Sequence, residues 1–131
     1  MPHEAEIRTA RGRSDAIDPA SIVVKHHRAG VAEIKASQLT GGRLLHLALA
    51  GCVFNNVLRI AGERGVEVRD ASVRVSGDFT SDGNSTGVEC SIDIDSNADP
   101  AVLRALAKDA FDDSTVGSVL RRGAKVELAG V

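Results

Sequence analysis

The chain has 131 residues and a net charge of −2, with 16 basic and 18 acidic side chains. This length suits one domain with its own core and is too short for two, so we expect a single domain over residues 1–131. The balanced charge gives no basic surface for nucleic acid, and the three phenylalanines, with no Tyr or Trp, leave no platform on which bases could stack. These features argue against nucleic-acid binding.

The apolar segments and the cysteines of the sequence indicate in which compartment the protein is found. Residues 1–6 are polar and acidic where a secretion signal would have an apolar stretch. The longest apolar run, Leu44–Phe54, contains a histidine and is well short of a membrane span. Two cysteines without a secretion signal are typical of thiols in a reducing compartment. We therefore expect a soluble, cytoplasmic protein that has no membrane segment.

The N-terminal third favours short strands. Glu4–Arg11 and Ile22–His27 alternate weakly and are bounded by turn-rich segments, which predicts two strands joined as a hairpin. Val31–Lys35 is a candidate third strand. His26 and His27 are neighbours on a predicted strand, so their side chains should point to opposite faces and cannot bind one metal ion together.

One long helix is predicted from about Arg43 to Arg64. Thr40 or the pair Gly41-Gly42 can start it, and Gly65 is well placed as its C-terminal glycine. The helix is apolar almost all the way round over Leu44–Phe54, so it must be covered on every side, and a second copy of the chain is a candidate source of that cover. Cys52, at the centre of this helix, is either inert packing or a nucleophile at the edge of a buried pocket.

The C-terminal half contains two further strands, two helices and a last strand. The predicted elements are strands Val66–Phe79 and Gly87–Asp95, a helix opened by Asp99-Pro100 with its apolar stripe from Val102 to Phe111, a short helix from Ser114 to Gly123, and a strand Ala124–Ala129. The order β-β-(β)-α-β-β-α-α-β predicts an α+β domain with mostly antiparallel pairing.

This order and the residues around Cys52 resemble the OsmC/Ohr family of thiol-dependent hydroperoxide reductases. The resemblance extends over nearly the whole chain and rests on four segments: the Gly41-Gly42 lead, the helix core Leu49–Phe54, the helix exit Ala61–Val66, and the closing helix pair that begins at Asp99-Pro100 and at Ser114. It implies an intertwined homodimer with the long helix buried between sheets and two pockets at the subunit interface.

The resemblance also implies a chemistry. In this family a thiolate attacks the O–O bond of an organic hydroperoxide, an arginine stabilises the thiolate, and a carboxylate orients that arginine. A second cysteine then resolves the sulfenic acid as a disulfide. Cys52 matches the attacking cysteine, and Arg13 is the best match for the arginine, with Arg11 and Arg28 as the other candidates.

Two of the four working groups are missing. The expected glutamate falls on Gly42 and the resolving cysteine falls on Ser114, so oxidised Cys52 would need an external thiol or a different internal partner. The other thiol, Cys90, shares a strand face with apolar residues, which favours a packing role.

Four further polar positions need an interpretation. Ser114 is most simply a helix cap, and a hydrogen-bonded core histidine is the favoured interpretation of His46. Asn55 and Asn56 either line a pocket beside Cys52 or pair with backbone elsewhere in the dimer.

Two functions stay open from the sequence. One is reduction of organic hydroperoxides through Cys52, with an arginine as activator. The other is a non-catalytic dimer that binds a small hydrophobic ligand in the interface pocket. The retained Cys52 favours the first, and the missing groups at Gly42 and Ser114 favour the second. We expect no cofactor and no metal ion in either case.

Overall fold

A five-stranded antiparallel sheet forms the body of the protein. The computed structural model describes residues 2–10, 21–36 and 38–131. The strands are β1 (His3–Thr9), β2 (Ser21–His26), β3 (Gly30–Lys35), β4 (Asp70–Phe79) and β5 (Ser85–Asp95), and their order in the sheet is β2-β3-β1-β4-β5. The helices are α1 (Gly41–Glu63), α2 (Pro100–Asp112) and α3 (Thr115–Arg122).

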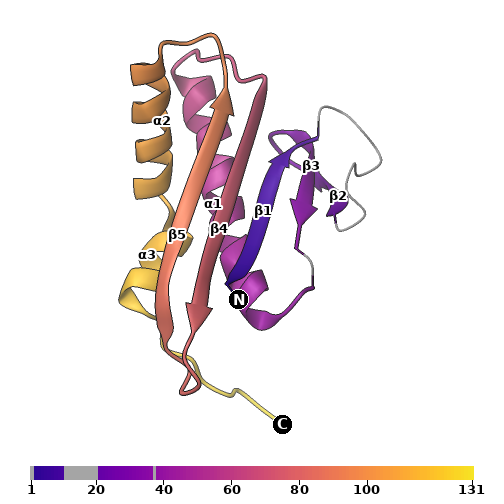
Figure 1. Ribbon diagram of the computed structural model, residues 1–131, viewed down its shortest axis with the longest axis vertical. Coiled ribbons are helices and arrows are strands. Elements are labelled where there is room, and N and C mark those ends of the chain that lie inside the picture. The colour runs from indigo at the N-terminus through magenta and orange to yellow at the C-terminus, as the bar shows by residue number, and fades with distance from the viewer. Residues whose placement is uncertain (1, 11–20, 37) are drawn as a thin grey trace.

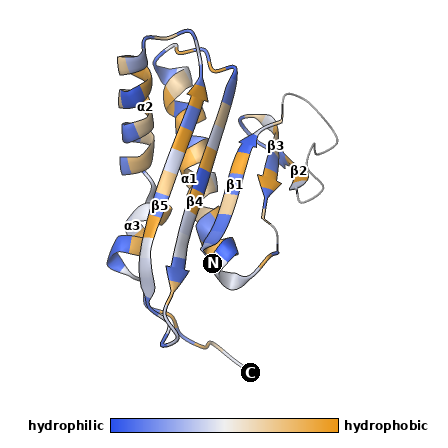
Figure 2. Ribbon diagram, in the orientation of Figure 1, coloured by the Kyte–Doolittle hydropathy of each residue, from blue (hydrophilic) through white to orange (hydrophobic). Residues whose placement is uncertain are grey.

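The helices lie on one face of the sheet. α1 packs along β1 and β4, while α2 runs beside β5 and α3 contacts α1 (Figure 1). Apolar and polar bands alternate along the strands, so that one face of the sheet meets the helices (Figure 2). The predicted α+β class with antiparallel pairing is therefore confirmed.

Local signals set the ends of α1. The Thr40 hydroxyl accepts a hydrogen bond from the backbone N–H of Arg43 at 3.3 Å and so caps the first turn. At the other end Gly65 adopts φ +68°, and the N–H of Val66 bonds to the carbonyl oxygen of Ala61 at 2.8 Å. This is the Schellman pattern, in which glycine takes the left-handed position just past the helix. The predicted helix is confirmed and begins two residues earlier than expected.

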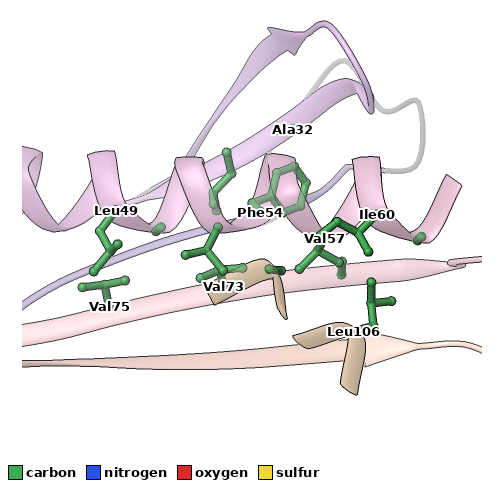
Figure 3. Packing of buried hydrophobic residues seen from close by; sticks show 14 residues of the cluster. Ala32, Leu49, Phe54, Val57, Ile60, Val73, Val75 and Leu106 are labelled. Carbon is green, nitrogen blue, oxygen red and sulfur yellow. The ribbon is translucent and has the colours of Figure 1, made fainter. Parts of the chain in front are cut away.

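The core lies between α1 and the middle of the sheet (Figure 3). Phe54 and Val57 of α1 and Val73 of β4 are completely buried, and Leu106 of α2 closes the cluster from the side. Burying each such side chain contributes roughly 1.5–3 kcal/mol. These contacts hold α1 along one side only.

The opposite side of α1 stays open to solvent. Leu44 is 49% exposed and Leu45 is 38% exposed. By length and composition α1 could cross a membrane, a test that core helices also pass, and half of its most apolar window is buried inside this domain. The sequence led us to expect that this helix is covered on every side. The described residues of one chain cover only one side of it.

The N-terminal pairing differs from the prediction. β1 lies between β3 and β4, with Ile7 opposite both Ile34 and Val73, and the hairpin is formed by β2 and β3. A short turn that ends at Gly30, with φ +77°, joins β2 to β3. The longer connection from β1 to β2 leaves β1 free to pair elsewhere, because lengthening a loop costs little entropy. The predicted hairpin of the first two strands was therefore wrong.

The strand predicted from Val66 begins only at Asp70. The N–H of Val66 is already bonded to the end of α1, so the chain is held at the helix before it reaches the sheet. The predicted last strand, Ala124–Ala129, is also absent. Gly123 (φ +77°) turns the chain away, and this segment finds no strand partner in the part of the chain that the structure describes (Figure 1).

Replacing Gly77 of β4 by alanine should destabilise the fold. A Cβ at this position would run into the carbonyl oxygen of Gly87 and would lie 3.3 Å from Cε1 of the buried His46 ring. Neither a paired strand backbone nor a buried ring can shift at low cost, so we expect a loss of about 1–3 kcal/mol in urea unfolding. Gly41→Ala is the control, because nothing lies within 4 Å of its Cβ. Equal effects of the two substitutions would contradict this packing.

Candidate functional site

Cys52 lies in the middle of α1, on the side that faces away from the core. Its thiol is free and half-buried. Ala48, one turn before it, is exposed, while Val53 beside it is completely buried. Cys52 is more than two turns from either end of the helix, so the helix dipole does little to stabilise a thiolate there. Any activation has to come from a neighbouring charge.

The described residues place none of the three candidate arginines, Arg13, Arg11 and Arg28, beside Cys52. Arg13 and Arg11 lie outside the described residues. Arg28 sits in the turn between β2 and β3, in a shallow pocket of about 360 Å³ that Ala61 and Gly62 also line. The α1 residues that line this pocket are Leu58, Ala61 and Gly62, and Cys52 is not among them. Within one chain, Arg28 and Cys52 are therefore not brought together.

Position 42 has no room for a side chain. A Cβ on Gly42 would lie 2.5 Å from Cε2 of Phe79 and 3.1 Å from Cδ2 of His3. The Phe79 ring packs edge-on against His3 at 5.3 Å and stacks on His46 at 5.5 Å. The place of the glutamate implied by the resemblance is thus taken by an aromatic cluster of His3, His46 and Phe79.

His46 anchors this aromatic cluster. It is completely buried, and its Nδ1–H donates to the backbone carbonyl oxygen of His3 at 2.5 Å. The interpretation of His46 as a hydrogen-bonded core residue is confirmed. The sequence did not reveal the cluster, because its three rings come from β1, α1 and β4, and no local pattern connects them.

The two asparagines after Cys52 differ. The Nδ2 of Asn56 donates to the backbone carbonyl oxygen of Ala110 at 3.1 Å and ties α1 to α2. The Oδ1 of Asn55 is buried and has no hydrogen-bond partner among the described residues. Asn56 therefore pairs with backbone of its own chain, whereas the buried Oδ1 of Asn55 has no such partner among the described residues.

Ser114 is a helix cap, as predicted. It is 2% exposed, and its Oγ accepts from the backbone N–H of Gly117 at 3.0 Å at the start of α3. A serine in this role has no thiol with which to close a disulfide, so the position implied for the resolving cysteine has only a structural task here.

Cys90 packs as a small apolar side chain. It lies on β5 against a shallow pocket lined by Ile92 and by Ala107 and Phe111 of α2. Burial raises the pKa of the Cys90 thiol to about 11. A thiol in such a site is almost entirely protonated at neutral pH, which supports the predicted packing role.

The histidine pair does not lie as predicted. The rings of His26 and His27 stack at 5.1 Å with an angle of 22° between their planes. β2 ends at His26, and His27 already belongs to the turn, so the alternation of a strand no longer separates them. Among the described residues, no group of three or more His, Cys, Asp and Glu side chains could hold a metal ion.

The fold and the free thiol define a small α+β domain with a cysteine on its long core helix. A family model described as OsmC-like protein matches residues 34–129, so the chain belongs to the OsmC-like family. A crystal structure of an OsmC-like hydroperoxide resistance protein from Jannaschia sp. CCS1 is similar in fold, with a TM-score of 0.59 and 15% identity. The match covers 99% of this chain and 96% of that one. No curated protein matches the sequence.

Cys90 should alkylate far more slowly than an ordinary thiol. With its pKa raised from 9.0 to about 11, its thiolate fraction at neutral pH is lower by roughly a hundredfold. The iodoacetamide rate of Cys90 in a Cys52→Ser variant should therefore rise about tenfold per pH unit until the pH approaches 11. A plateau near pH 9 would show that this thiol is not held in an apolar site.

Proposed function

We propose that this protein reduces organic hydroperoxides through Cys52, as a homodimer that uses an external thiol as reductant. The observation that carries the proposal is the position of Cys52, a free thiol on the open apolar side of the core helix in a member of the OsmC-like family. The similar structure from Jannaschia is named a hydroperoxide resistance protein, which supports the same direction. Free thiols fit the reducing cytoplasm, where we propose that the protein acts.

The proposed chemistry begins with attack of the Cys52 thiolate on the terminal oxygen of a hydroperoxide ROOH. The S–O bond forms as the O–O bond breaks, and the alkoxide leaves as the alcohol ROH after taking up a proton. Sulfur is oxidised to the sulfenic acid, and the peroxide is reduced. A small thiol then forms a mixed disulfide with Cys52 and releases water. A second small thiol attacks the sulfur of the first in that mixed disulfide. Cys52 leaves as the thiol, and the two small thiols leave joined as a disulfide.

The surroundings of Cys52 favour alkyl substrates. The open side of α1 carries Leu44, Leu45 and Ala48 on the turns before the thiol and has no charged side chain within the preceding two turns. An apolar wall binds an alkyl chain through burial of its surface and gives hydrogen peroxide no comparable gain. In this proposal Arg13, contributed by either chain, stabilises the thiolate.

The open side of α1 and the unpaired C-terminal segment together support the homodimer. Val126 is 90% exposed and Leu128 is 82% exposed, and they alternate with Lys125 and Glu127 as in a strand with one apolar face. The family model extends to residue 129, so this segment belongs to the domain. We propose that it pairs with the sheet of the partner and that the two α1 helices cover each other.

The alternative function is a dimer that binds a small hydrophobic ligand without turnover. The features that favour it are the filled space at Gly42 and the capping role of Ser114, which leave Cys52 without the carboxylate and the second thiol that the family resemblance implies. The same apolar wall would then hold a ligand beside an unreactive thiol.

One equivalent of an alkyl hydroperoxide such as cumene hydroperoxide should convert Cys52 to a sulfenic acid. Because Cys90 lies under α2 with its pKa raised by burial, no internal thiolate is ready to resolve the product. Intact-mass spectrometry should show the gain of one oxygen, or one dimedone adduct, and excess peroxide should give the sulfinic acid.

Matched variants locate the reaction. Cys90→Ser should react like the wild type, and Cys52→Ser should gain nothing. Loss of two hydrogens from the wild type would mean an internal disulfide and would exclude the one-cysteine mechanism. No mass change at all would favour the ligand-binding alternative.

Leu44→Glu should break the proposed dimer. Leu44 is 49% exposed in the single chain and lies on the side of α1 that we assign to the interface, where a carboxylate would have to lose its hydration. Light scattering at micromolar concentration should show a dimer for the wild type and a monomer for the variant. Val102→Glu on α2, where Val102 is 43% exposed, is the control and should stay dimeric. A wild-type monomer would refute the assembly.

A further inference from the structure

His26 holds the turn between β2 and β3 through its ring nitrogen. The Nδ1 atom of His26 accepts hydrogen bonds from the backbone N–H groups of Arg28 at 3.1 Å and Ala29 at 3.0 Å. An atom that accepts two N–H groups carries no proton of its own, so the ring is neutral with its hydrogen on Nε2. Only the uncharged form of His26 can therefore accept these two hydrogen bonds.

The same ring connects the turn to the core helix. His26 packs edge-on against Phe54, with ring centroids 5.2 Å apart and planes at 85°, and Phe54 is completely buried. On its other side His26 stacks with His27 at 5.1 Å. His27 and Arg28 in turn line the shallow pocket beside Leu58 of α1. The closed turn thus covers this flank of α1.

The charged groups that face His26 all oppose its protonation. They are His27 and Arg28 of the turn itself, whereas its contact on α1 is the uncharged Phe54. Burial, followed by the charges of His27 and Arg28, lowers the pKa of His26 below its ordinary range. No ion pair with a carboxylate joins His26 among the described contacts.

We propose that His26 is an acid-sensitive latch, whose protonation at Nδ1 replaces an acceptor by a donor, breaks both hydrogen bonds to the turn, and releases residues 27–29 from the flank of α1. The proton comes from solvent, and no other bond changes. Opening exposes the faces of Phe54 and Leu58 that the turn covers. This device is independent of the peroxide chemistry proposed for Cys52.

The direction of the pH dependence follows from linkage. In the open turn His26 has its ordinary pKa of about 6.5, and in the closed turn its pKa is lower, so the open state binds more protons. The closed state keeps its full stability above about pH 6.5 and loses it as the pH falls toward the pKa of the closed form. The opening equilibrium therefore grows by up to about tenfold per pH unit over this window.

Amide hydrogen exchange of the full chain, followed by NMR from pH 7.5 to 5, tests the latch. After correction for intrinsic exchange rates, protection of the Arg28 and Ala29 amides should fall by up to about tenfold per pH unit below 6.5. Amides in the centre of β4, such as Val73, should not change. Protection at Arg28 and Ala29 that stays constant over this range would overturn the proposal.

His26→Asn is the matched variant, because an asparagine Oδ1 can accept the same two N–H groups and does not titrate. Its turn amides should be protected equally at pH 7.5 and pH 5. A pH-dependent loss of protection in this variant equal to that of the wild type would overturn the latch. His27→Asn should keep the response, since the acceptor remains on His26.

The ring itself gives a second measurement that needs no variant. At pH 7.5 the side-chain ¹⁵N shifts of His26 should show a neutral ring protonated at Nε2, and they should move to the charged form over the same pH range in which the turn amides lose protection. A ring protonated at Nδ1 at pH 7.5, or a titration separate from the loss of protection, would refute the mechanism.

Discussion

The one-sided burial of α1 is the constraint on which the rest of the structure depends. The helix is apolar around most of its circumference, yet the sheet and α2 cover only the side that carries Val53, Phe54 and Val57. The described residues leave Leu44 49% exposed and Leu45 38% exposed. Leaving apolar side chains such as these in water is unfavourable, and this cost is the argument for the dimer proposed above.

The two ends of α1 are specialised in different ways. At its N-terminal end, Gly42 lets Phe79 and His3 approach the helix backbone, and His46 closes this cluster from within. The result is tight aromatic packing where the family resemblance implies a carboxylate. Toward the C-terminal end, the flank of α1 is covered by the turn that His26 holds. The open side of the helix that carries Cys52 runs between these two regions.

The features that were predicted best from the sequence are those that residues close together in the chain determine. The caps at Thr40, Asp99 and Ser114 and the glycine after α1 are local signals, and all of them act as expected. The position of β1 between β3 and β4 was missed, because both hairpin and insertion satisfy the same apolar alternation. The last strand was predicted from an alternation that the sequence contains, but a strand forms only beside another strand, and the described residues of one chain offer it no partner. The aromatic cluster and the stacked histidines depend on tertiary contacts that no sequence window contains.

Cys90 shows what burial alone does to a thiol in this protein, since an apolar environment raises its pKa to about 11. Cover by apolar groups alone works against any thiolate, because desolvation disfavours the charged form. A reactive Cys52 therefore requires that the surface which covers it also brings a cation, and Arg13 is the residue that the family resemblance offers. The two candidate functions differ in this respect: the proposed peroxidase needs cover that includes a guanidinium, whereas the proposed ligand-binding dimer needs only an apolar pocket.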